Sequence, residues 1–223
     1  DRDKVDHIFS PPNSFGPEVD KIFEKKFKNL VKNVISGNEQ GASHMADGYA
    51  RVTGKPGVVV CDSDTSGTNT ITGLQTANMD SAPIVVFICH FSEDDKLSNV
   101  FNQIDHIGIS RSTTKHNFLV EDVMDLSRIV REALYLSVTG RPGAILVDIP
   151  KHVLFLEYKF NFPKINKVSG YSIPKESKIS DINKAANLIM KAKRPIVFGG
   201  GGIVISGATE ELQNFANRLK TVS

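Results

Sequence analysis

Glu39 is the residue whose type and position most clearly suggest chemistry. It lies in the stretch SGNEQGASHMADGYA, residues 36–50, where an expected strand at about 29–35 gives way to an expected helix at 39–53. In an open parallel α/β sheet, ligands bind at such junctions, and a carboxylate there can act as a base. The residues alone leave an alternative open, because an acid in the first turn of a helix also interacts favourably with the helix dipole.

Two basic residues and a glycine run could bind an anionic ligand. Arg141 precedes and Lys151 follows an expected buried strand, but TGRPG is also an ordinary turn and Lys151 can be a solvated lysine. The run 199–202, which contains Gly200 and Gly201, would let a backbone approach a phosphate or a ribose. It lacks a G-x-G-x-x-G spacing and is weak by itself.

Histidines and cysteines offer little metal chemistry. The six histidines are scattered, and of His44 and His90, which come nearest to the presumed site, we expect neither to act chemically. Cys61 and Cys89 lie in or at the end of apolar runs, which favours buried free thiols over a disulfide. No cluster of Cys and His residues predicts a zinc site.

Short apolar runs alternate with segments of helical periodicity. The predicted strands are 5–9, about 29–35, 57–62, 84–90, 144–149 and 195–200. The predicted helices are 39–53, about 67–80, 121–138, 179–192 and 209–220. This alternation predicts an α/β fold, a parallel sheet with helices on both faces.

The alternation of strand and helix patterns is interrupted once, which predicts two domains. Residues 1–151 form the first, and 152–176, which mix Lys, Pro and aromatic residues without a period, read as a connector. Residues 177–223 begin a second, incomplete α/β domain.

The chain has 223 residues and a net charge of +2, which is close to neutral. We therefore expect neither a nucleic-acid nor a membrane partner, and no apolar run is long enough for a membrane span.

The segment GNEQGASHMADGYARVTGKPG, residues 37–57, resembles the catalytic subunit of acetohydroxyacid synthase (acetolactate synthase), a thiamine-diphosphate enzyme. Further matching segments are MDSAPIVVF (79–87), GISRSTTKHNFLVEDV (108–123), TGRPGAILVDIPKHV (139–153) and KRPIVFGGGG (193–202). The resemblance implies that residues 1–151 form the domain that binds the cofactor's aminopyrimidine. Residues 177–223 would begin the central, FAD-type domain.

The family reaction, in branched-chain amino-acid biosynthesis, is decarboxylation of pyruvate and condensation with a 2-oxo acid. Glu39 would be the catalytic residue, hydrogen-bonded to a pyrimidine nitrogen so that the imino tautomer is favoured. The resemblance implies cofactor contacts for Glu39, Asn69, Phe101, Arg141, Lys151, Gly200 and Gly201. By the same resemblance, Arg141 and the glycine run 199–202 would contact FAD, and Lys151 would lie at the mouth of the active site. A third domain would hold the diphosphate and Mg²⁺; its GDG motif does not occur here, so no residue of this chain is expected to bind the metal.

The departures from the family pattern cluster at the cofactor loops. SPPNSFG (10–16) stands for GYPGGA, SDTSGTN (63–69) for SGPGATN, and CHFS (89–92) for GQVP. The residues that replace glycine or proline in the first two loops are Asn13, Ser14, Asp64, Thr65 and Ser66. Asn102 takes the place of a glutamine after Phe101, whereas Thr68 and Asn69 are retained. Side chains in place of glycine would crowd a cofactor or a partner subunit.

Two hypotheses follow. In the first, the chain is the N-terminal part of an acetolactate-synthase-type subunit that cannot act alone, and a partner subunit in a homo- or hetero-oligomer holds the diphosphate. In the second, it is a catalytically inactive relative that serves as a structural or interaction module. The resemblance places a eukaryotic protein in the mitochondrion or plastid and a bacterial one in the cytoplasm.

Overall fold

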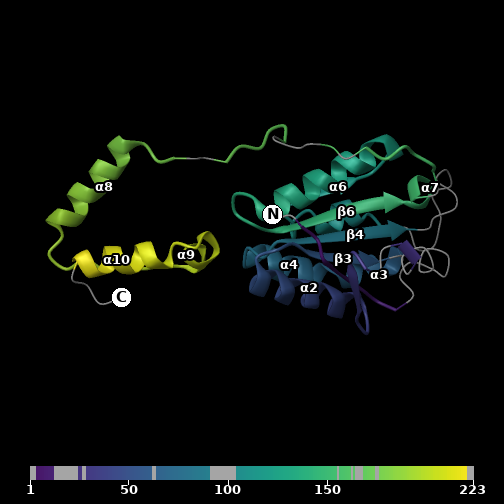
Figure 1. The fold of residues 1–223 in the computed structure, drawn as a ribbon, viewed down its shortest axis with the longest axis horizontal. Coiled ribbons are helices and arrows are strands. Elements are labelled where there is room, and N and C mark those ends of the chain that lie inside the picture. The colour runs from purple at the N-terminus through teal and green to yellow at the C-terminus, as the bar shows by residue number, and fades with distance from the viewer. Residues whose placement is uncertain are drawn as a thin grey trace. The chain divides into compact units, whose positions relative to one another are not determined.

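The computed structural model describes residues 4–12, 25–26, 29–61, 64–90, 104–154, 156–161, 163, 168–173 and 176–219. Contacts between residues divide the chain into two compact units, Asp1–Tyr171 and Ser172–Ser223 (Figure 1). The division falls within the predicted connector 152–176.

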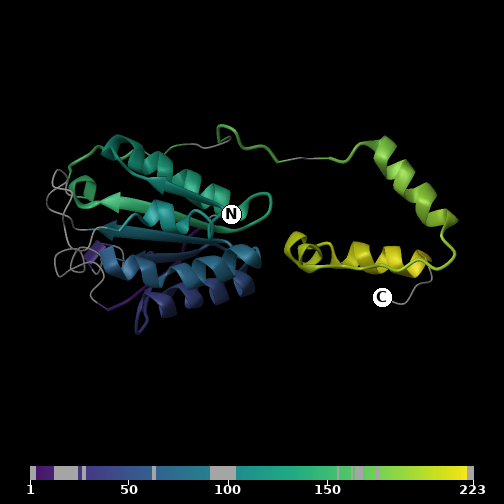
Figure 2. The ribbon, with the colours of Figure 1, turned by 180° about the vertical axis from the view of Figure 1, so that it is seen from behind.

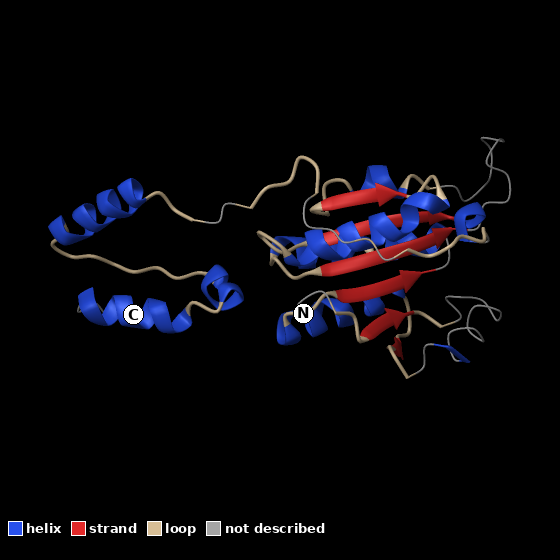
Figure 3. Ribbon diagram, turned by 45° about the horizontal axis from the view of Figure 1, so that its top comes forward, coloured by secondary structure: helices blue, strands red, loops and turns tan. Residues whose placement is uncertain are grey.

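The first unit is built on a six-stranded, all-parallel sheet with the strand order β2-β1-β3-β4-β6-β5. The strands are β1 (His7–Ser10), β2 (Lys32–Ile35), β3 (Gly57–Cys61), β4 (Ile84–His90), β5 (His116–Leu119) and β6 (Ala144–Pro150). Figure 3 shows them side by side in red. The apolar runs of β3, β4 and β6 are almost fully buried, as parallel strands covered on both faces are. The predicted α/β fold with a parallel sheet is confirmed.

Helices cover both faces of this sheet. They are α2 (Glu39–Thr53), α3 (Asp64–Asn69), α4 (Ile71–Met79), α5 (His106–Ser110), α6 (Val123–Val138) and α7 (Lys151–Leu154). Figures 1 and 2 show α2 and α4 on one face and α6 on the other. Because alternate residues of a strand point to opposite faces, Ile84 and Val86 of β4 join the core under α2 and α4, whereas Val85 joins the core under α6.

Local sequence sets the position of α2. The side chain of Asn38 caps its first turn by accepting a hydrogen bond from the Gly41 N–H at 2.7 Å. The helix ends at Gly54, which adopts the left-handed conformation with φ 69°. Gly57, at the start of β3, lies so close to the Ala46 carbonyl that no Cβ would fit between them. The helix therefore packs tightly onto the sheet.

Several predicted elements differ from the structure. The predicted helix at 67–80 is two helices, α3 and α4, separated at Thr70. The edge strand β5 and the short helices α5 and α7 were not predicted. The predicted strand 195–200 is wrong: these residues are not paired in a sheet, and Ile196 and Phe198 are 90% and 96% exposed. An apolar run forms a strand only where a neighbouring strand can accept its backbone hydrogen bonds.

The second unit contains α8 (Ile179–Lys191), α9 (Gly201–Ser206) and α10 (Thr209–Leu219). Helices were predicted at the positions of α8 and α10. The segment before this unit is anchored to the first one, because Val168 and Tyr171 pack against the core under α6. The Lys115 ammonium donates hydrogen bonds to the Thr139 carbonyl at 2.8 Å and to the Tyr171 hydroxyl at 3.2 Å.

Candidate functional site

Glu39 lies at the edge of the sheet where the strands end, which we call the carboxyl edge. It is the first residue of α2, which follows β2, and its side chain is half-buried. Asn69, the last residue of α3, follows β3 and lies beside it. The Asn69 Nδ2 donates a hydrogen bond to Glu39 Oε2 at 3.0 Å. The structure therefore brings two of the predicted site residues into direct contact.

The turn before Glu39 is tied to the end of β1. The backbone N–H of Ser36 donates to the Ser10 carbonyl at 2.9 Å. The Ser36 hydroxyl lies 2.5 Å from the Asn38 carbonyl oxygen, to which it donates. With the Asn38 cap, these bonds hold the first turn of α2 against the sheet and fix the backbone from which the Glu39 side chain extends.

A buried pair beneath α3 was not predicted. His106 of α5 is 1% exposed and Asp148 of β6 is 4% exposed, and His106 Nδ1 lies 3.6 Å from Asp148 Oδ2. Neither had been singled out, although Asp148 interrupts the apolar run AILVDI. A charged residue inside a buried parallel strand is a signal that could have revealed it, because burying a charge costs free energy unless a partner compensates it.

Arg141 lies at the amino ends of the strands, away from the carboxyl edge where Glu39 lies. The reason is that Arg141 precedes β6, whereas Glu39 follows β2. Its Nε donates to the Ser81 hydroxyl at 2.8 Å and its Nη2 to the Met79 carbonyl at 2.9 Å. Ser81 has a positive φ of 62°, so Arg141 braces a strained turn between α4 and β4. The structure does not bring Arg141 and Glu39 together.

The other predicted positions are dispersed. Lys151 begins α7 directly after β6, at the carboxyl edge, but its side chain is outside the description. Gly200 caps α9 and Gly201 begins it, and a Cβ added at either would meet no atom within 4 Å. Phe101 lies outside the described residues. So do Asn13, Ser14 and Asn102, and of Asp64, Thr65 and Ser66 only the backbone is described, in α3.

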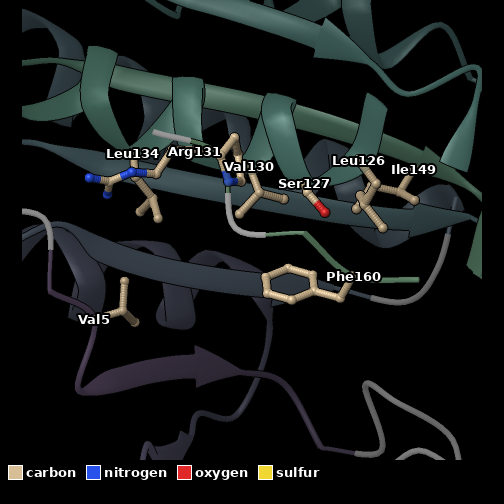
Figure 4. Close-up of a pocket in the computed structure, with 9 residues that line it drawn as sticks. Val5, Leu126, Ser127, Val130, Arg131, Leu134, Ile149 and Phe160 are labelled. Carbon is tan, nitrogen blue, oxygen red and sulfur yellow. The ribbon is translucent and has the colours of Figure 1, made fainter. Parts of the chain in front are cut away.

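The first unit also contains an apolar pocket of about 510 Å³ on the α6 side of the sheet (Figure 4). It is lined by Val5, Leu126, Ser127, Val130, Arg131, Leu134, Ile149, Phe160 and Pro163. None of the predicted site residues is among these lining residues, so this pocket is separate from the Glu39 carboxylate. Across the described ranges, no three His, Cys, Asp or Glu side chains gather as a metal site, and no helix has the length and apolar character to cross a membrane.

Comparison with known proteins decides the family. Residues 1–109 match the thiamine pyrophosphate enzyme N-terminal TPP binding domain, and residues 182–222 match the thiamine pyrophosphate enzyme central domain. The chain belongs to the thiamine pyrophosphate enzymes. Glu39 and Asn69 both lie within the region matched to the TPP binding domain.

Acetolactate synthases are similar to nearly the whole chain. The large subunit from Buchnera aphidicola (subspecies Schizaphis graminum) is 41% identical over 217 residues, which are 96% of this chain and 38% of that protein. The acetolactate synthase of Mycobacterium bovis is 38% identical over 213 residues, 95% of this chain and 34% of that protein. The predicted resemblance is confirmed, and the chain spans little more than a third of the length of these relatives.

Proposed function

We propose that this protein is the catalytic chain of an acetolactate-synthase-type enzyme, which uses thiamine diphosphate to decarboxylate pyruvate and to condense the product with a 2-oxo acid. The observation that carries the proposal is the Glu39 carboxylate, held by the Asn69 amide at the carboxyl edge of a parallel sheet. The match to a TPP binding domain and the names of the relatives support the reaction class.

The described residues fit the aminopyrimidine end of the cofactor. Glu39 is half-buried, and the Asn69 amide donates a hydrogen bond to one oxygen of its carboxylate. A carboxylate in this position would hydrogen-bond a pyrimidine nitrogen and hold a proton between the two groups, which is the acid–base role proposed for Glu39. When bound, thiamine diphosphate supplies an acidic thiazolium carbon and an electron sink for decarboxylation.

The remaining cofactor contacts belong to the same proposal and rest on the resemblance. The diphosphate and Mg²⁺ would be held by residues beyond this chain, in a partner subunit of an oligomer. FAD would contact Arg141, Gly200 and Gly201. Two of the Arg141 donors already bind Ser81 and Met79, so a flavin contact would use the remaining N–H groups of the guanidinium.

The test is calorimetry of thiamine diphosphate binding to the full-length protein, followed by an assay of acetolactate formation from pyruvate. We expect Glu39→Gln to lower turnover by about 10²–10⁴-fold, the usual contribution of a general acid–base group. Glu210→Gln, an exposed acid in the first turn of α10, is the matched control and should retain turnover. Absence of cofactor binding by the full-length protein would refute the proposal.

The comparisons do not favour the alternative, a non-catalytic structural or interaction module. That alternative rests on the residues that replace glycine or proline in the first two loops, and of these the structure describes the backbone of Asp64, Thr65 and Ser66. The same two measurements separate the hypotheses, because a non-catalytic module would show no turnover of pyruvate in any oligomer.

A further inference from the structure

The buried pair His106 and Asp148 lies directly beneath the helix that carries Asn69. A buried ionisable pair loses solvation, and replacing such a pair by apolar residues is often neutral or stabilising. His106 is 1% exposed, so in this conformation its ring cannot touch a substrate at the carboxyl edge. A contribution to the site must therefore pass through the residues that His106 contacts.

The imidazole ring is packed against the backbone of α3. A Cβ added to Gly67 would lie 2.6 Å from His106 Nε2 and 2.9 Å from the Cδ1 of Ile88. Real Cβ atoms do not approach other atoms this closely, so α3 sits on the ring as near as a glycine allows. On its other side, the ring faces Asp148 of β6. The ring and the Ile88 side chain therefore both support α3 at Gly67.

The contacts continue from α3 to the catalytic position. The Gly67 carbonyl accepts hydrogen bonds from the Thr70 hydroxyl at 2.7 Å and the Thr70 N–H at 3.2 Å, which closes the last turn of α3. Asn69 lies within that turn, and its amide donates to Glu39. A shift of Gly67 by a few tenths of an ångström would move the Asn69 amide relative to the Glu39 carboxylate.

We propose that His106 and Asp148 are positioning residues for the thiamine-diphosphate site. Asp148 orients the imidazole, the imidazole supports Gly67, and the turn that follows holds the Asn69 amide against Glu39. This inference rests on the proposed function, since it assigns a role in cofactor binding. A simple core-filling role for His106 would require only its volume, not a polar atom facing Asp148.

The experiment compares His106→Leu, which keeps most of the volume, with His106→Asn, which keeps a polar atom near the Nδ1 position. We expect His106→Leu and Asn69→Ala each to weaken thiamine diphosphate binding to the full-length protein by about tenfold, the equivalent of one hydrogen bond. The double variant should bind no more weakly than the weaker single one, because both changes remove the same orientation of Glu39. His106→Asn should recover most of the affinity, and His116→Asn on the edge strand β5 is the control.

A core-filling role predicts a different result. In that case His106→Leu lowers the thermal midpoint but leaves the affinity of the folded protein unchanged, or the two losses multiply in the double variant. Either outcome overturns the inference.

Hydrogen–deuterium exchange without cofactor separates this failure from failure of the proposed function. His106→Leu should speed amide exchange in residues 67–70 and leave α6 unchanged. If the wild-type protein binds no thiamine diphosphate, the proposed function fails, and unchanged exchange at 67–70 would refute the support of α3 by His106 on its own evidence.

Discussion

The two units use similar helix patterns to different effect. In the first unit, α2 buries Ala42, Ala46 and Ala50 against the sheet. In the second, α8 has an amphipathic pattern of the same kind but no buried residue, and Leu188 and Met190 are 72% and 81% exposed. The pattern in the sequence therefore predicts that a helix forms, but not what covers its apolar face.

The difference shows where stability resides. Apolar area removed from water stabilises a fold by about 25 cal/mol per Å², and an isolated helix of this length is marginal in water without such burial. The sheet of the first unit supplies a surface on both faces. Among the described residues of the second unit, Ala216 is the buried apolar residue, so its helices gain little from packing in this structure.

Truncation of a leucine in each unit should give the largest contrast. Leu74 of α4 is 0% exposed, and Leu74→Ala is expected to lower the free energy of unfolding by about 2–5 kcal/mol through lost burial and a residual cavity. Leu188→Ala should change it by less than about 0.5 kcal/mol, because the side chain is exposed and alanine favours helices. Urea denaturation followed by hydrogen exchange, in β4 for the first unit and in α8 for the second, measures both. Equal losses would show that α8 is covered in solution.

Adding a methyl group should give a smaller contrast of the same kind. Gly57→Ala forces a Cβ against the Ala46 backbone and should destabilise the first unit by about 1–3 kcal/mol. Gly202→Ala in α9, where a Cβ meets no atom within 4 Å, should be neutral or slightly stabilising, because alanine is the better helix former. Thermal melts monitored by circular dichroism distinguish the two. A tolerated Gly57→Ala would mean that α2 can move away from β3.

Much of this fold follows from local sequence. The long apolar strands and capped helices were predictable because each has a period and a terminator that act locally. The strand β5 was not, since its four residues form an edge with half of their side chains exposed. The prediction of a strand at 195–200 was wrong for a different reason. Apolar character alone cannot reveal whether a partner strand is present.

The candidate site divides in the same way. Glu39 was predictable from its place at a strand-to-helix junction, and the separation of Arg141 from it follows from the direction of β6 alone. The pairing of His106 with Asp148 was not predictable. β5 and α6 separate α5 from β6 in the chain, so His106 and Asp148 meet only when these elements have packed together. Long-range packing, not local pattern, sets the support beneath α3.

The smallest expected effect concerns the carboxylate that ties β1 to α2. Asp6 Oδ1 lies 2.8 Å from His7 Nδ1, and Asp6 also accepts hydrogen bonds from Lys55 at 2.5 Å and from the Tyr49 hydroxyl. The hydrogen bond with His7, followed by those from Lys55 and Tyr49, holds the pKa of Asp6 well below its usual range. A carboxyl whose folded pKa is depressed contributes stability above its unfolded pKa of about 3.9, and this contribution is lost as the pH falls towards the folded value.

Asp6→Asn should therefore lower the stability of the first unit at pH 6, and the difference from wild type should shrink as the pH falls from about 4 towards 2. Asp6 is about one third exposed, so solvent screening keeps the effect below about 1 kcal/mol.

Asp181→Asn in α8 is the matched control. Its carboxylate lies 3.6 Å from the Lys184 ammonium at an exposed position, and its removal should leave acid unfolding of the first unit unchanged. Urea titrations at each pH measure the difference. A gap that stayed constant between pH 6 and 2 would mean that Asp6 acts through packing rather than charge, and the contrast between the units would then rest on buried apolar area alone.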